Sequence, residues 1–110
     1  MTTKTSKRDQ YTGVYLGLLP QLAQLYWIVD DCRPYSGSAR HNELADAAIA
    51  AISTGMMYMK YACMLARTGR ATTRRMAQRE ILEQNFIRSE TDWKKAQSKA
   101  LAFYTRLNNK

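Results

Sequence analysis

The sequence predicts an all-α protein, a small antiparallel helical bundle with coiled-coil-like packing. Apolar residues recur at alternating spacings of four and three along three long stretches, the pattern of a helix that buries one face. The chain has 110 residues, of which 45% are hydrophobic, and it contains only five glycines and two prolines. We therefore expect one packed domain over residues 1–110, with either four helices or three and one long C-terminal helix.

The first helix is expected from about residue 9 to residue 31, after a polar N-terminal tail over residues 1–8. Pro20 should bend this helix or start a new segment, because proline lacks an amide hydrogen and clashes with the preceding turn. The segment 33–38 reads as a loop. The expected buried face consists of Tyr11, Tyr15, Leu18, Leu22, Leu25, Val29 and Cys32.

The second helix is expected over residues 42–66, with Asn42 as its N-cap and Gly69 as its terminator. It carries two neighbouring apolar stripes, and Lys60 is its only charged residue from 47 to 66. Such a helix must be surrounded. It is either central to the fold or contacts another subunit through its small-residue stripe, so we expect an oligomer or larger assembly. The first stripe is Ala45, Ile49, Ile52, Met56, Met59, Cys63 and Ala66; the second, small-residue stripe is Ala51, Gly55, Tyr58, Ala62 and Leu65.

The C-terminal stretch contains neither glycine nor proline after Gly69, so one helix from about residue 73 to residue 107 is possible. The sequence from Ser89 to Asp92 resembles a helix start, with a serine cap followed by two acids. We favour a break near Ser89, which gives four helices. The apolar seam in either case is Leu82, Phe86, Ser89, Trp93, Ala96, Ala100, Phe103 and Leu107.

The positive charge is concentrated in a basic C-terminal region, residues 67–110. Residues 1–66 hold six basic and five acidic side chains, whereas residues 67–110 hold eleven and four. Five arginines and no acid lie between Arg67 and Arg79, which is typical of a surface that binds a polyanion. The candidate nucleic-acid-binding residues are Arg67, Arg70, Arg74, Arg75, Arg79, Lys94, Lys95, Lys99 and Arg106. Arg70, Arg74, Arg75 and Arg79 are the leading four.

Contact with the phosphate backbone of RNA or DNA fits this run better than reading of bases. Arginine suits bidentate phosphate contacts, and the run contains no lysine. A helix-turn-helix across Ser89 lacks the usual turn glycine and would place Glu90 and Asp92 against phosphates. The alternative to nucleic-acid binding is that Arg67 and Arg70 only place positive charge near the C-terminus of the second helix, where it complements the helix dipole. Tyr35, in the loop, is the best candidate for stacking on a base.

No catalytic, metal or cofactor site is expected. Cys32 and Cys63 form no CxxC motif, and His41 has no partner at a ligand or catalytic spacing. The polar residues 1–10 do not resemble a signal peptide. We expect free thiols in a reducing, cytoplasmic compartment, and no enzyme activity.

In size and charge alone, this chain resembles the accessory subunits of retroelement ribonucleoproteins and the small helical subunits of CRISPR effector complexes. The resemblance implies a role in an assembly and assigns no residues. Together with the basic region it predicts a non-catalytic RNA-binding or DNA-binding accessory subunit, with protein partners or further copies bound through residues 42–66.

Two other functions are open. One is an adaptor whose basic face binds an acidic protein. The other is a small two-span membrane protein of the holin type, because residues 47–66 are twenty long and precede basic residues. Lys60 and Pro20, each inside a span, argue against membrane insertion.

Overall fold

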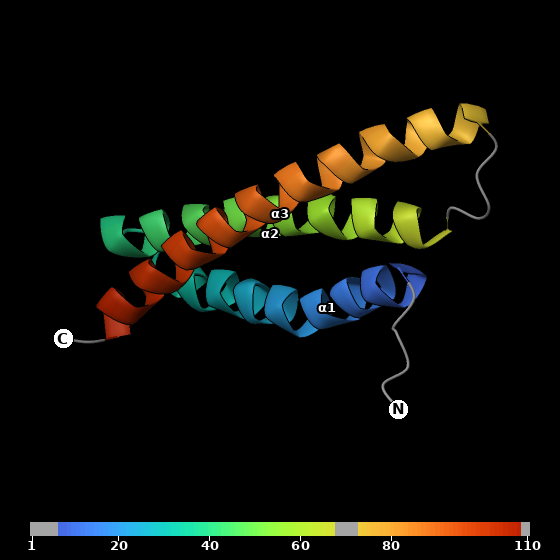
Figure 1. The fold of residues 1–110 in the computed structure, drawn as a ribbon. Helices are drawn as coiled ribbons and strands as arrows, with labels where there is room; N and C mark the ends of the chain where they lie inside the picture. Colours follow the sequence, from blue (N-terminus) through green and yellow to red (C-terminus); the bar gives the residue numbers. More distant parts are fainter. Residues whose placement is uncertain (1–6, 68–72, 109–110) are drawn as a thin grey trace.

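The structure, a computed structural model, describes residues 7–67 and 73–108 of the chain. These ranges form α1 (Lys7–Cys32), a short 3₁₀ turn η1 (Arg33–Tyr35), α2 (Ala39–Arg67) and α3 (Thr73–Asn108). α1 and α2 make an antiparallel hairpin, and α3 runs back along α2 and crosses the pair obliquely (Figure 1). The predicted all-α class is confirmed, and the described ranges hold three long helices.

The favoured break near Ser89 is wrong, because α3 continues through it for 36 residues. Ser89 is buried, and its Oγ donates to the Phe86 carbonyl at 2.8 Å, a bond within a helix and not a cap. The apolar seam of α3 explains why the helix is continuous through Ser89. Phe86 and Trp93 lie on opposite sides of Ser89 along one face, and a new helix axis would take one of them off the core.

Pro20 starts no new segment, since α1 runs through it for 26 residues. Its missing amide deprives the Leu16 carbonyl of its usual partner. The next residue, Gln21, adds a side-chain hydrogen bond to this turn of the helix: its Nε2 donates to the Gly17 carbonyl at 2.9 Å. The Oε1 of Gln21 accepts from Gln97 Nε2 at 2.6 Å, which links α1 to α3. The expected face of α1 is confirmed, with Leu18, Leu22, Leu25 and Cys32 buried.

α2 begins at Ala39, so the choice of Asn42 as its N-cap is wrong. Ser38 takes that place: its carbonyl accepts from the Asn42 N–H at 3.0 Å, and its Oγ accepts from the His41 N–H at 3.4 Å. The side chain of Asn42 turns back and donates to the Ser36 carbonyl at 2.9 Å. The hydroxyl of Ser38 thus caps the helix earlier than the sequence suggested.

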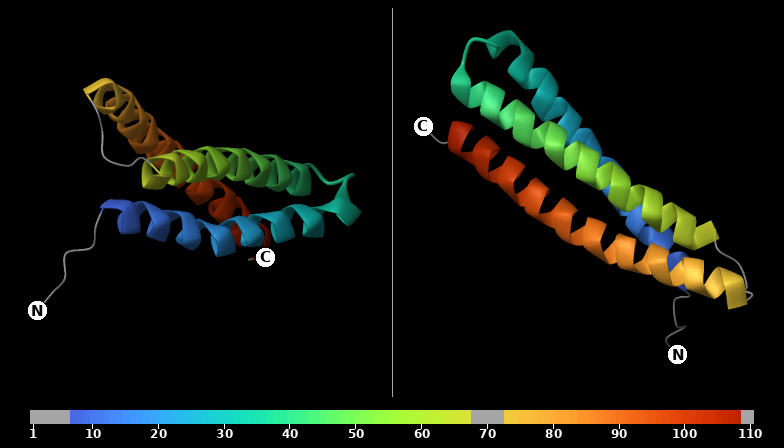
Figure 2. Two further views of the ribbon diagram at one scale, coloured as in Figure 1. Left: turned by 90° about the vertical axis from the view of Figure 1, so that its right-hand side faces the viewer. Right: turned by 90° about the horizontal axis from the view of Figure 1, so that it is seen from above.

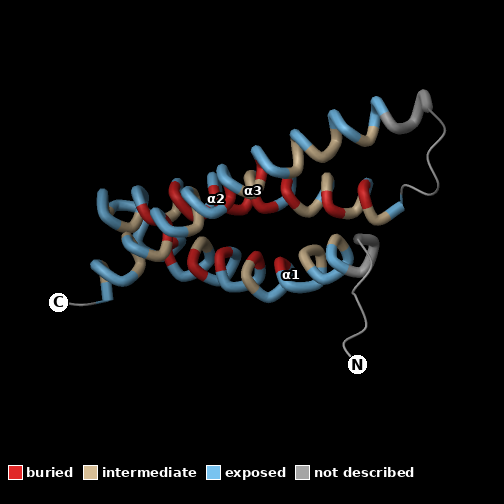
Figure 3. Tube along the Cα trace, viewed as in Figure 1, coloured by how far each residue is buried: buried red, intermediate tan, exposed pale blue. Residues whose placement is uncertain are grey.

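The small-residue stripe of α2 lies in the core of this chain, as expected if α2 is the central helix of the fold, and not on a surface that another subunit could cover. A Cβ on Gly55 would lie 2.7 Å from Leu22 Cδ2 and 2.7 Å from Trp93 Cζ3, which makes Gly55 the meeting point of all three helices. The other stripe is divided: Ile49 is 52% and Met56 50% exposed, whereas Ile52 is buried. Burial follows α2 along its whole length (Figure 3). Its buried residues are Leu44, Ala47, Ala48, Ala51, Ile52, Gly55, Tyr58, Ala62 and Leu65.

Within the described ranges, α2 is the one helix long and apolar enough to cross a membrane, by length and composition only. A helix at the centre of a globular core meets the same criteria. Nine residues of α2 are buried between α1 and α3, so the packing of this chain accounts for much of its apolar character.

Candidate nucleic-acid interface

Three helix termini lie at one end of the molecule, where the start of α3 stands apart from the α1–α2 hairpin (Figure 1). The start of α1, the end of α2 and the start of α3 lie at the same end in Figures 1 and 2. The antiparallel hairpin brings the first residues of α1 close to residues some sixty positions later in the chain. Five basic residues occupy these termini, and we call them the basic end: Lys7, Arg8, Arg67, Arg74 and Arg75. Arg70 lies outside the described residues.

The start of α3 is electrostatically uncompensated. A helix N-terminus carries a partial positive charge and is stabilised by acidic side chains in its first turn. α3 has no acid there and has Arg74 and Arg75 instead. The amide dipoles and the guanidinium groups therefore favour an external anion at this place. Arg67, by contrast, is exposed in the last turn of α2, where a cation suits the dipole.

Arg79 is less available than the other arginines of the run. Its side chain is 28% exposed, and its Nε lies 3.4 Å from Glu83 Oε1, one helical turn on. Because the chain itself supplies this countercharge, an incoming phosphate would have to compete with Glu83. Arg79 remains a candidate, but it is the weakest of the leading four.

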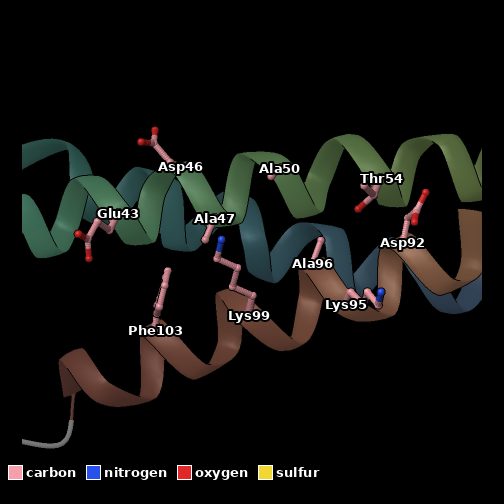
Figure 4. Close-up of a pocket in the computed structure, with 10 residues that line it drawn as sticks. All are labelled: Glu43, Asp46, Ala47, Ala50, Thr54, Asp92, Lys95, Ala96, Lys99 and Phe103. Carbon is pink, nitrogen blue, oxygen red and sulfur yellow. The ribbon is translucent and has the colours of Figure 1, made fainter.

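The lysines of α3 lie among acidic side chains. Lys94 Nζ is 3.4 Å from Glu90 Oε1. Lys95 and Lys99 line a groove between α2 and α3 that has a volume of about 760 Å³ (Figure 4). Three carboxylates line the same groove: Glu43, Asp46 and Asp92. The expected outward basic face of the last helix is therefore divided, and the groove has both signs of charge.

The two groups of cations are far apart. Arg74 and Lys95 are separated by 21 residues of one continuous helix, about 31 Å at 1.5 Å per residue. Arg106 lies farther still, with its guanidinium 5.7 Å from the centre of the Phe103 ring. Arg67 at the end of α2 and Arg74 and Arg75 at the start of α3 thus lie toward one end of the molecule, and Lys94, Lys95, Lys99 and Arg106 lie along the rest of α3.

Sequence reasoning missed three basic residues. Lys7 and Arg8 were assigned to a polar tail, although an antiparallel hairpin places the start of its first helix beside the end of its second. Arg88 was passed over although it lies one heptad before Lys95, and it lines a second, smaller pocket between α2 and α3. The spacing alone could have identified Arg88.

Among the aromatic residues, Tyr35 is half-exposed, but one face of its ring is stacked on His41 with centroids 4.4 Å apart. His41 is held in place, with Nδ1 2.8 Å from Ser38 Oγ. Trp93 is buried in the core, as its position on the seam predicted. Trp27, which the sequence did not single out, is 71% exposed.

The thiols offer little chemistry. Cys32 is buried and Cys63 is half-buried, and both are free. Burial, and to a lesser extent the nearby Asp31, raises the pKa of the Cys32 thiol above its ordinary value. A raised pKa keeps the sulfur protonated at neutral pH and so makes it a poor nucleophile. Among the described residues, no three His, Cys, Asp or Glu side chains are grouped to hold a metal ion.

Comparison with known proteins finds no matching protein-family model, no similar curated protein and no similar solved structure.

Proposed function

We propose that this protein is a non-catalytic nucleic-acid-binding subunit that contacts a phosphate backbone through its basic end. The observation that supports this most is the convergence of two segments distant in sequence. The start of α1 adds Lys7 and Arg8 to an end that already carries Arg67, Arg74 and Arg75. Arg70, between α2 and α3, belongs to the same basic segment of the chain.

The proposed contact is sequence-independent. Phosphate oxygens supply the anions that the first turn of α3 lacks, and each neutralised phosphate releases condensed counterions whatever the base. A guanidinium group can hold two phosphate oxygens at once. No base-reading element is invoked, because Glu90 and Asp92 lie on the part of α3 that would have to enter a groove.

The mixed charge of the α2–α3 groove makes it a poorer site for a polyanion. Glu43, Asp46 and Asp92 would repel phosphates drawn to Lys95 and Lys99. We assign these lysines, with Arg106, a secondary role: they favour the approach of a long polyanion without fixing it. This division between the two groups makes the proposal testable by substitution.

The test compares two variants that each remove four positive charges. One changes Arg67, Arg70, Arg74 and Arg75 to alanine; the matched control changes Lys94, Lys95, Lys99 and Arg106 to alanine. Binding to short fluorescein-labelled single-stranded RNA and duplex DNA is followed by fluorescence anisotropy at fixed salt. Circular dichroism verifies that both variants remain helical.

We expect the first variant to lose affinity by at least about tenfold, and the control by much less, because only the first removes direct phosphate contacts. Equal losses would contradict a localised site, and a larger loss in the control would move the site to α3. An acidic polypeptide such as polyglutamate that binds while RNA and DNA do not would support the adaptor function instead.

A further inference from the structure

The α1–α2 pair is covered by α3 on one side only. The side of α1 that meets α3 is marked by Gln21, whose side chain bonds to Gln97. At 3.6 residues per turn, the residues roughly opposite Gln21 form one continuous face. That face is exposed and apolar: Leu16 is 56% exposed, Leu19 45%, Tyr26 51% and Trp27 71%, and Ala23 lies among them.

α2 extends this face. Tyr58 marks the side of α2 that meets α3, since its hydroxyl donates to Glu90 Oε2 at 2.8 Å. Ile49 and Met56 lie about 160–180° around the helix from Tyr58, and each is half-exposed. The two helices therefore present a joint apolar face away from α3, which we call the outer face: Leu16, Leu19, Ala23, Tyr26, Trp27, Ile49 and Met56.

The outer face lies in uncharged stretches of a strongly charged protein. Residues 10–29 and 47–59 contain no Asp, Glu, Lys or Arg, although the chain has a net charge of +8. Two copies repel each other wherever basic surfaces approach. Two uncharged faces can approach each other without this electrostatic repulsion. In a dimer with a two-fold axis, each copy contributes the same patch to the interface.

The exposed side chains suit the same occupant. Trp27 is the most exposed large apolar residue of the outer face, and Leu16 and Tyr26 are each more than half exposed. Aromatic residues such as Trp27 and Tyr26 are the kind that dominate the binding energy of such interfaces.

From these observations we infer that the outer face is a self-association surface, occupied by the outer face of a second copy. This differs from the interface expected from the sequence, because it uses α1 together with Ile49 and Met56 of α2 and leaves the small-residue stripe in the core. A lipid surface is the poorer occupant: helices that lie on membranes carry lysine and arginine beside their apolar face, and residues 10–29 of α1 carry none.

The first test is the mass of the protein in solution, measured by size-exclusion chromatography with light scattering over a concentration series. Nuclease treatment and high salt remove bridging by nucleic acid, so the outcome is independent of the proposed function. The matched variants are Trp27→Glu on the outer face and Ile87→Glu on α3, where Ile87 is 64% exposed.

We expect the wild type and Ile87→Glu to form dimers or higher oligomers, and Trp27→Glu to be a helical monomer. A monomeric wild type, or oligomers that survive Trp27→Glu, would overturn the inference. Acrylamide quenching gives a second readout, since Trp27 is exposed in the monomer and Trp93 is not. Quenching should decrease as the protein concentration rises. Protection of Trp27 only on anionic vesicles, with monomeric mass, would assign the face to lipid and overturn the proposal.

Discussion

Gly55 lies where all three helices come into close contact. Its backbone lies so close to Leu22 and Trp93 that any larger residue would force the indole ring or the leucine to move. Elsewhere in a helix, alanine is better than glycine by about 1 kcal/mol, because glycine loses more backbone freedom on folding. The packing at Gly55 should reverse that preference.

We predict that Gly55→Ala destabilises the protein by about 1–3 kcal/mol, the usual cost of overpacking a core. Gly17→Ala is the matched control, because it lies in α1 with nothing within 4 Å of its added Cβ. That change should be stabilising by up to about 1 kcal/mol. Urea unfolding followed by circular dichroism measures both. A Gly55→Ala protein as stable as the wild type would contradict the three-helix contact.

The hydroxyl of Tyr58 makes a polar link between α2 and α3. It donates to Glu90 Oε2, and it lies beside Phe86, with ring centroids 5.0 Å apart. Burial, followed by the hydrogen bond and charge of Glu90, raises the pKa of Tyr58 well above its ordinary value of 10.0. The folded protein therefore holds this proton more tightly than the unfolded chain does.

The stabilisation from this proton should be complete below pH 10 and should be lost progressively as the pH rises above it, where the unfolded chain has released the proton and the folded protein has not. Tyr58→Phe removes the hydroxyl. We expect this variant to be less stable than the wild type at pH 7, and the difference to shrink above pH 10. Urea unfolding of both proteins across this range measures it; a pH-independent difference would contradict the link.

At the scale of the helix, the continuity of α3 gives Ser89 a role opposite to the one its sequence context suggests. As an N-cap, its replacement by alanine would cost about 1 kcal/mol. Inside a continuous helix, alanine has the better propensity, and the lost bond to the Phe86 carbonyl is a local one. We predict that Ser89→Ala changes the free energy of unfolding by less than about 0.5 kcal/mol. A loss above about 1 kcal/mol would favour a break.

The apolar seams of α1 and α3 could be predicted from sequence because each keeps one unbroken spacing of four and three along its helix. Leu18, Leu22 and Leu25 on α1 and Trp93 and Ala100 on α3 are buried as their spacing indicates. The spacing did not show that α1 also carries an exposed apolar face, which includes Leu19 and Trp27.

The orientation of α2 could not be predicted in the same way. Its two stripes have the same spacing of four and three, so periodicity alone does not say which of them is buried. The bulk of Trp93 decides the outcome, since a helix that packs against an indole needs Gly55 at the contact. The residue that decides which stripe of α2 is buried therefore lies in another helix, about forty residues away in the sequence. The basic end was only partly foreseen for a similar reason: Lys7 and Arg8 join the arginine run through topology.

At the scale of the whole molecule, charge and apolar surface are separated. The basic end gathers cations from all three helices, while the outer face holds none between residues 10 and 29. Under the two proposals, one surface binds a polyanion and the other binds a second copy, and the two surfaces share no residue. Self-association would bring two basic ends onto one nucleic acid and raise the apparent affinity through effective concentration.

The salt dependence of nucleic-acid binding tests the central claim most directly. Anisotropy titrations over a range of salt concentrations give the slope of log affinity against log salt for the wild type and for the variant that lacks Arg67, Arg70, Arg74 and Arg75. If these arginines contact phosphates, the slope should flatten by about three units on single strands, at about 0.7 per lost contact. A folded variant with the wild-type slope would contradict the assignment of the basic end.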